Sequence, residues 1–271
     1  MNSPRSDAPS DAPPPVNAFD IALLLGAGLL GGASNALAGG GTFFTFPAMI
    51  EVGLSPVVAN ASNAVALWPG RFPSVLAGWR DLKKLRQRLP MSCAIAAIGS
   101  LFGAWLLLST QERVFTAMIP WLLLFATLLF AFGAKLVPLF RAMKPKRGGT
   151  GAAFVAGAIF ETIVAIYGGY FGAGAAFMVM AGNAMTGVDD VHQNVALKNL
   201  LITLMTTVSV AVFVIAGAVA WRETLIMMLG AFPGGYIGAK FARRLHPVRL
   251  RVAIIAIGLA MSAYYFAKVY L

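Results

Sequence analysis

The chain has 271 residues, of which 59% are hydrophobic and only 11% are charged. Soluble domains carry about 25% charged residues, so this composition excludes a soluble protein and leaves no length for a sizeable soluble domain. The formal net charge of +11 does not indicate a nucleic-acid partner, because the cations lie in short clusters between apolar runs, as in the cytoplasmic loops of membrane proteins.

The N-terminal segment differs from the rest of the chain. Residues 1–17 are rich in Pro, Ser, Asp and Ala, and they lack the basic start and short apolar core of a signal peptide. We expect a disordered tail there. A first transmembrane repeat is predicted over residues 18–140, a basic linker over 141–150 and a second transmembrane repeat over 151–271.

A glycine-rich break interrupts a long apolar run near the start of each predicted repeat. The first break is Gly39-Gly40-Gly41-Thr42, and the second is Gly168-Gly169-Tyr170-Phe171-Gly172-Ala173-Gly174. Backbone N–H and C=O groups that lose their helical hydrogen bonds inside the bilayer must find partners in the protein or in a water-filled cavity. Broken helices at corresponding places in two halves are a sequence indication of a transporter's substrate site.

The segments after each break follow the same order in both halves. A short apolar segment comes first and three helices follow, at residues 42–54, 56–78, 90–108 and 113–140, and again at 175–187, 190–219, 224–241 and 248–269. Gly99 aligns with Gly234, and Gly103 aligns with Gly238. The sequence therefore predicts an all-α polytopic membrane protein of two repeated halves with glycine-broken helices.

Charge in the loops differs between equivalent positions of the two halves. Basic clusters lie within residues 80–88, 135–147 and 240–251, whereas the loops at 109–113 and 221–223 carry almost no excess charge. The positive-inside rule then places equivalent loops on opposite sides of the membrane. We favour inverted repeats with an odd number of crossings each. The alternative is an even number, with re-entrant segments after the glycines.

These motifs resemble those of the sulfite exporter TauE/SafE family. The resemblance covers roughly residues 20–270 and is carried by Gly39-Gly40-Gly41 to Pro47, Gly53-Leu54-Ser55-Pro56, Ala59-Asn60-Ala61-Ser62, Tyr167 to Gly174, Gly187 and Ala196-Leu197-Lys198-Asn199. The second half departs from the first where Met180 replaces Pro47. The resemblance implies a secondary transporter of the bacterial inner membrane that exports sulfite, sulfonates or related small anions by alternating access, without specifying the compound.

Two cations in the helices after the breaks are the candidates for recognition of an anion. We expect Lys198 to supply the main charge and Arg71 to act as a second cation or as a gate. A guanidinium can hold an oxyanion through two parallel hydrogen bonds, and an ammonium supplies a compact charge. Alternatively, Arg71 extends to the membrane edge and Lys198 pairs with Glu161 or Asp190.

Polar residues and glycines near the breaks complete the predicted site. Amides and hydroxyls can donate hydrogen bonds to an anion, and helix N-termini carry partial positive charge. The same residues can instead join or pack helices. The predicted substrate-binding set comprises Gly40, Gly41, Thr42, Asn60, Ser62, Asn63, Arg71, Gly172, Gly174, Asn194, Lys198 and Asn199.

Glu161 and His192 are the candidates for proton coupling. Glu161 lies inside an apolar run, and a histidine titrates near neutral pH, although each can be structural. We expect no enzyme activity, cofactor or metal site, because the chain has two His and one Cys and lacks a phosphate-binding loop.

The expected partners are a small anionic substrate, the lipid bilayer and a coupling proton. Nucleic acid is not expected as a partner, and the oligomeric state stays open, with a homodimer among the alternatives. An anion channel and a non-transporting membrane scaffold are the other functions considered, and the repeated broken helices favour transport over a scaffold.

Overall fold

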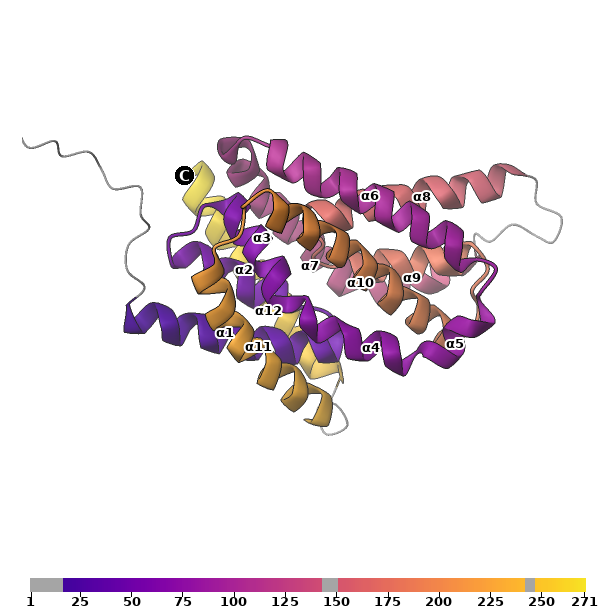
Figure 1. Cartoon of the computed structure of the whole chain (residues 1–271), viewed down its shortest axis with the longest axis horizontal. Coiled ribbons are helices and arrows are strands. Elements are labelled where there is room, and N and C mark those ends of the chain that lie inside the picture. The colour runs from indigo at the N-terminus through magenta and orange to yellow at the C-terminus, as the bar shows by residue number, and fades with distance from the viewer. Residues whose placement is uncertain (1–16, 143–150, 242–246) are drawn as a thin grey trace, which may run out of the picture.

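The computed structural model describes residues 17–142, 151–241 and 247–271, and these residues form helices joined by short turns (Figure 1). In the first half the helices are α1 (Ala18–Ala38), α2 (Thr42–Glu51), α3 (Pro56–Leu67), η1 (Pro69–Arg71), α4 (Phe72–Ala77), α5 (Trp79–Lys84), α6 (Leu89–Ser109) and α7 (Glu112–Ala142). In the second half they are α8 (Gly151–Tyr170), α9 (Ala175–Met185), α10 (Val191–Ile215), α11 (Trp221–Phe241) and α12 (Pro247–Tyr270). The predicted all-α class is confirmed. The predicted tail and basic linker lie outside the described residues, apart from residues 17, 141 and 142.

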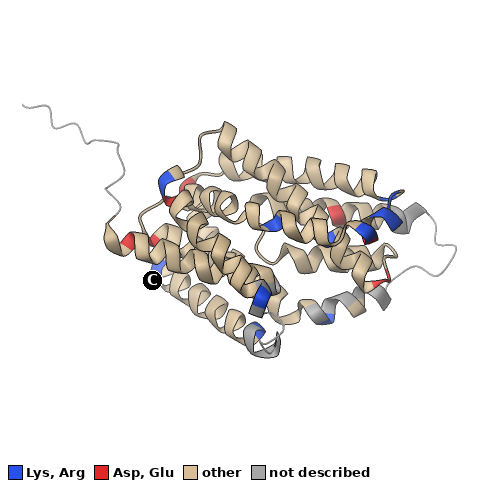
Figure 2. Ribbon diagram, turned by 60° about the horizontal axis from the view of Figure 1, so that its bottom comes forward, with Lys and Arg blue, Asp and Glu red and all other residues tan. Residues whose placement is uncertain are grey.

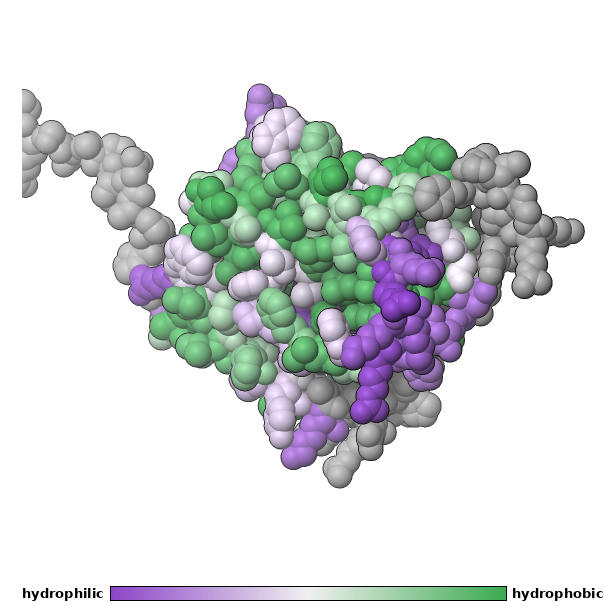
Figure 3. All heavy atoms as spheres, turned by 45° about the vertical axis from the view of Figure 1, so that its right-hand side comes forward, coloured by the Kyte–Doolittle hydropathy of each residue, from purple (hydrophilic) through white to green (hydrophobic). Residues whose placement is uncertain are grey.

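Five of the described helices are long and apolar enough to cross a bilayer. They are the segments Ala18–Ala36, Leu89–Ser109, Glu112–Gly133, Val191–Ile215 and Arg251–Tyr270. Large apolar side chains such as Ile98 and Trp121 are exposed on their outer faces. Apolar residues cover much of the face in Figure 3, and hydrophilic residues gather toward the end that carries α5. Such a surface suits lipid contact, and the chain is a multi-pass membrane protein.

The prediction of one continuous helix over residues 56–78 is wrong. The chain instead forms α3, the 3₁₀ turn η1 and the short helix α4. Pro69 begins η1, and Pro73 lies in the first turn of α4. Proline lacks an N–H donor, and its ring clashes with the carbonyl group of the preceding turn, so two closely spaced prolines interrupt the helix. Arg71 consequently lies at a helix break.

Long helices of the first half pack against helices of the second half. In Figure 1, α1 lies beside α11 and α6 lies beside α8, in agreement with their contacts. A Cβ atom added at Gly99 of α6 would lie 3.2 Å from the carbonyl oxygen of Thr162, and one added at Gly234 of α11 would overlap the carbonyl oxygen of Leu29. Small residues allow this close backbone approach. When the glycine breaks are aligned, Thr162 corresponds to Leu29, so equivalent close contacts occur in both halves.

Charged residues concentrate toward the ends of the molecule. Figure 2 shows both basic and acidic residues at the end that carries α5 and at the opposite end, with further Lys and Arg between them. The Arg251 guanidinium donates hydrogen bonds to the carbonyl oxygens of Phe130 and Ala131, at 3.0 and 2.8 Å, which holds the start of α12 against α7. The Glu51 carboxylate lies 3.4 Å from the Lys268 ammonium.

The shared side of the basic loops is a testable prediction. With Cys93 replaced by Ser, single cysteines at Lys84 and Lys240 should react with a membrane-impermeant maleimide from the same side of the membrane. Both lysines are exposed, and each belongs to a different basic cluster. The positive-inside rule puts such clusters in the cytoplasm. Labelling of the two positions from opposite sides would contradict the predicted inverted repeats.

Candidate functional site

A cavity of about 510 Å³, including its part open to solvent, lies where the second glycine break meets α3 and α10. Both halves of the chain contribute to it. The first residues of the two short helices, Thr42 of α2 and Ala175 of α9, belong to its wall. Its polar side chains are those of Thr42, Asn60, Asn63, Arg71, Thr206 and Ser209. The cavity thus lies at the helix ends that the glycine breaks create.

The second break holds the start of α9 at this cavity. α8 ends at Tyr170, and the next residues turn because Gly172 and Gly174 have φ values of 76°, a left-handed conformation that favours glycine. The Tyr167 hydroxyl donates a 2.6 Å hydrogen bond to the carbonyl oxygen of Ala173 and braces the turn. Gly172 lines the cavity, where its lack of a side chain leaves the backbone accessible.

Two asparagines of α3 connect the breaks and line the same cavity. The Asn60 amide donates a 2.9 Å hydrogen bond to the carbonyl oxygen of Tyr170, which lies at the end of α8 in the other half. At the first break, the Thr45 hydroxyl is hydrogen-bonded to the Asn63 side chain and to the carbonyl oxygen of Gly41. These bonds satisfy polar groups beside the interrupted helices, as a membrane interior requires.

Arg71 brings a positive charge to the cavity wall. Its Nε atom is buried and has no hydrogen-bond partner among the described residues. Among the described lining residues there is no Asp or Glu that could balance the charge. A partly buried cation without a counter-charge is unfavourable, and the N-termini of α2 and α9 add partial positive charge at the same place. The arrangement is suited to an anion.

Lys198 lies near Arg71 but is not part of the cavity wall. Its position on α10 is close enough to Arg71 for the two positive charges to interact. Among the described residues no carboxylate forms an ion pair with it. Glu161 instead pairs with Arg88 at 2.7 Å, and the Asp190 carboxylate caps α10 by accepting a hydrogen bond from a backbone N–H. The alternative pairing of Lys198 with either acid is therefore wrong.

Three predicted polar residues join helices outside the cavity. The Ser62 hydroxyl accepts a 3.0 Å hydrogen bond from the backbone N–H of Ala220. The Asn194 amide donates at 3.0 Å to the carbonyl oxygen of Met180, and Asn199 donates at 3.3 Å to that of Ser74. These contacts agree with the structural alternative for such residues in membrane helices.

Three predicted glycines also lie away from the cavity wall. A Cβ atom at Gly41 would lie 2.6 Å from the carbonyl oxygen of Gly31 on α1, and one at Gly40 would lie 3.1 Å from the Phe130 ring. A Cβ atom at Gly174 would lie 3.3 Å from the carbonyl oxygen of Ala126. These glycines allow the short helices to pack closely, whereas Thr42 and Gly172 contact the cavity.

The two candidates for proton coupling occupy different environments. His192 is exposed at the start of α10, near Asp81 of α5. Glu161 is partly buried and lines a second cavity. Among the described residues, no group of three or more His, Cys, Asp or Glu side chains is placed to hold a metal ion.

Sequence reasoning expected α10 to contribute through Asn194, Lys198 and Asn199, and it missed the residues further along α10 that line the cavity. Met205, Thr206, Ser209 and Phe213 line it. The Thr206 and Ser209 hydroxyls donate to carbonyl oxygens of their own helix, at 2.8 and 2.9 Å, which keeps them satisfied in an apolar run. Their spacing of three residues within the apolar helix was a signal of a shared helix face.

Comparison with known proteins agrees with this architecture. The family model described as sulfite exporter TauE/SafE matches residues 24–265. A probable membrane transporter protein (ORF9) of a Sinorhizobium species is 26% identical over 248 residues, covering 89% of this chain and 90% of that protein. One from Haemophilus influenzae is 24% identical over 244 residues, covering 90% and 93%. The probable membrane transporter protein YfcA of Escherichia coli K12 is 26% identical over 244 residues, covering 90% and 88%.

No solved structure is a significant match to the chain. The family model nevertheless spans almost the whole of the helical region described above. The chain therefore belongs to the sulfite exporter TauE/SafE family of membrane transporters.

Proposed function

We propose that the protein is a secondary transporter that exports small sulfur-containing anions, of the sulfite, sulfonate or sulfoacetate type, by alternating access. The observation that carries this proposal is Arg71. Its buried Nε has no hydrogen-bond partner among the described residues, and those that line the cavity include no carboxylate. A guanidinium forms paired, charge-assisted hydrogen bonds with oxyanions. A sulfite or sulfonate group presents several oxygens for such bonds.

The surroundings of Arg71 support a small oxyanion as the ligand. The amide and hydroxyl groups of Asn60, Asn63 and Thr42 line the same cavity as Arg71. The starts of α2 and α9, at Thr42 and Ala175, approach it from the two halves. Discontinuous helices whose N-termini point at anionic groups are a recurring arrangement in secondary transporters.

Binding and counterflow measurements test the proposed function. The purified protein should bind sulfite or sulfoacetate more tightly than acetate, because a tetrahedral or pyramidal sulfur oxyanion offers more acceptors to the guanidinium. Taurine serves as a zwitterionic control. In proteoliposomes loaded with unlabelled anion, the labelled anion should accumulate transiently by exchange. Anion flux without counterflow would favour a channel, and absence of both binding and flux would refute the proposal.

A further inference from the structure

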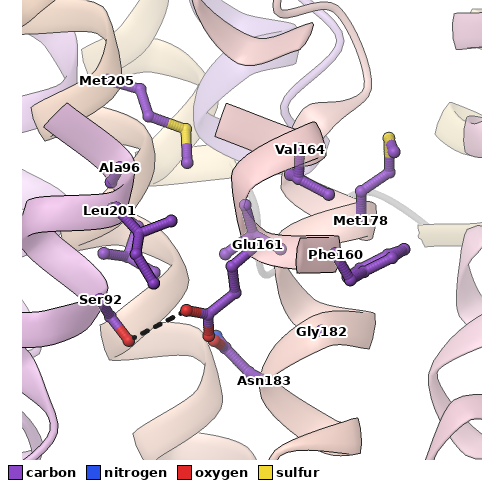
Figure 4. Close-up of a pocket in the computed structure, with 12 residues that line it drawn as sticks. Ser92, Ala96, Phe160, Glu161, Val164, Met178, Gly182, Asn183, Leu201 and Met205 are labelled. Carbon is purple, nitrogen blue, oxygen red and sulfur yellow. Dashed lines mark hydrogen bonds between the residues drawn. The ribbon is translucent and has the colours of Figure 1, made fainter. Parts of the chain in front are cut away.

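A second cavity, of about 270 Å³ including its part open to solvent, lies between α6, α8, α9 and α10. Met205 lines this cavity as well as the cavity that contains Arg71. Most of its wall is apolar, but Ser92, Glu161 and Asn183 bring polar groups together at one end (Figure 4). A carboxylate in a mostly apolar cavity of a membrane protein is unusual and is most often functional.

Glu161 of α8 forms an ion pair with Arg88, which also contacts the end of α9. Its Oε1 atom accepts a hydrogen bond from Arg88 Nη2 at 2.7 Å, and Oε2 lies 3.4 Å from the Ser92 hydroxyl. The other guanidinium nitrogen, Nη1, donates at 2.9 Å to the carbonyl oxygen of Thr186. Arg88 precedes α6 and Thr186 follows α9. Arg88 thus joins the start of α6 to Glu161 of α8 and to the residue that follows α9.

Asn183 has a buried acceptor that no group of the described residues satisfies. The Asn194 amide nitrogen donates to the carbonyl oxygen of Met180, which fixes the orientation of the Asn194 side chain. Asn194 Oδ1 then accepts a hydrogen bond from Asn183 Nδ2 at 3.1 Å. Rotating either amide would bring two acceptors or two donors together. Asn183 Oδ1 is consequently left buried without a partner among the described residues. An unpaired buried acceptor is unfavourable and calls for an additional donor.

We infer that Glu161 and Asn183 form the proton-binding site that couples proton movement to anion transport, an inference that rests on the proposed function. A proton from water adds to the Glu161 carboxylate, the O–H then donates to Asn183 Oδ1, and the ion pair with Arg88 is released. Deprotonation reverses these steps, and no other covalent bond changes. The two groups are close, because a Cβ atom on the neighbouring Gly182 would lie 4.0 Å from Glu161 Cγ.

The charged surroundings favour a proton over a metal cation. The Arg88 guanidinium, at the start of α6, already forms an ion pair with the Glu161 carboxylate. α9 contains no ionisable side chain. On α10, Lys198 lies near Arg71, and His192 is exposed at the helix start. Arg88 would repel a metal ion, whereas neutralisation of Glu161 by a proton removes the attraction that holds Arg88.

The proton site and the anion cavity share two helices. Glu161 lies seven residues before Gly168 on α8, which is about two helical turns, and Gly168 lines the anion cavity. α9 begins at that cavity with Ala175, and Thr186, directly after its last residue, accepts a hydrogen bond from Arg88. Protonation of Glu161 would therefore release the far ends of the helices that surround the anion.

Flux into proteoliposomes under a pH gradient tests the coupling. The probe is radiolabelled sulfoacetate, because its charge is constant between about pH 6 and about pH 8. The wild-type protein should accumulate it, and a gradient of about one pH unit supports at most about tenfold accumulation for one proton per anion. Glu161→Gln should retain counterflow and lose gradient-driven accumulation, whereas Glu161→Asp should retain both. Glu51→Gln, which neutralises the glutamate paired with Lys268, is the matched control and should behave as wild type.

The outcomes separate this inference from the proposed function. Wild-type counterflow that does not respond to the gradient would overturn proton coupling and leave anion transport intact. Equal gradient response in Glu161→Gln and wild type would show that the proton binds elsewhere. Should Glu161→Gln fail to fold, a pH electrode decides the point on wild-type protein in unbuffered detergent solution. Addition of sulfoacetate should then cause proton uptake, and binding without uptake would overturn the inference. Absence of both counterflow and binding would overturn both proposals.

Discussion

Replacing Arg71 with Gln should weaken anion binding by about 30-fold or more, because removal of one partner of a buried, hydrogen-bonded charge pair costs about 2–5 kcal/mol. Among the described residues that line the cavity, Arg71 is the one cation, and its buried Nε has no hydrogen-bond partner in the described part of the chain. Calorimetric titration of the purified variant with sulfoacetate measures the change. Arg71→Lys should be intermediate, since it keeps the charge but loses the paired geometry.

Lys198→Gln is the matched control for this prediction. Lys198 lies near Arg71 but does not line the cavity, so its loss should reduce binding only through longer-range attraction, by about threefold or less at physiological salt. The salt dependence of binding should follow Arg71 more than Lys198. A greater loss in Lys198→Gln than in Arg71→Gln would exchange the roles of the two cations and restore the ranking expected from the sequence.

The sequence was sufficient to identify both cations but not to rank them. A charge in an apolar run is visible without a structure, and so are the two glycine breaks that bound the cavity. The expected ranking rested on Lys198 lying one helical turn beyond Asn194, but neither residue lines the cavity. The helix expected over residues 56–78 is interrupted by the turn at Pro69 and the short helix containing Pro73. That turn is what places Arg71 in the cavity wall beside α3.

The environment of Glu161 was hidden from sequence reasoning for a different reason. Arg88 belongs to a basic cluster that the positive-inside rule already explains. The sequence pattern therefore does not distinguish Arg88 from Lys83 or Lys84. Its contact with Glu161 joins positions separated by 73 residues. Asn183 is likewise an isolated amide in a short apolar helix, and its unpaired oxygen emerges only from the orientation of Asn194.

Gly32→Leu should prevent formation of a stably folded protein. Gly32 lies on α1 against α11, where an added Cβ atom would overlap the carbonyl oxygen of Ala231 and lie 2.9 Å from the backbone nitrogen of Gly235. Overpacking commonly costs about 1–3 kcal/mol and occasionally more, and backbone atoms cannot rotate away as a side chain can. We expect the upper end of this range or beyond, measured as a lower unfolding temperature and loss of monodisperse protein in detergent.

Gly26→Leu on the same helix separates this packing effect from the effect of a larger apolar residue. A Cβ atom at Gly26 would meet nothing within 4 Å, and leucine favours a helix over glycine by up to about 1 kcal/mol, so this variant should be as stable as wild type or more stable.

Gly103→Leu tests the contact of α6 with α8, where the added atom would overlap the carbonyl oxygen of Ile166. Similar losses in Gly32→Leu and Gly103→Leu would mean that each half depends on a helix of the other for stability. Unfolding of Gly32→Leu at the temperature of Gly26→Leu would contradict that dependence, because the α1–α11 contact would then tolerate a side chain that its backbone spacing excludes.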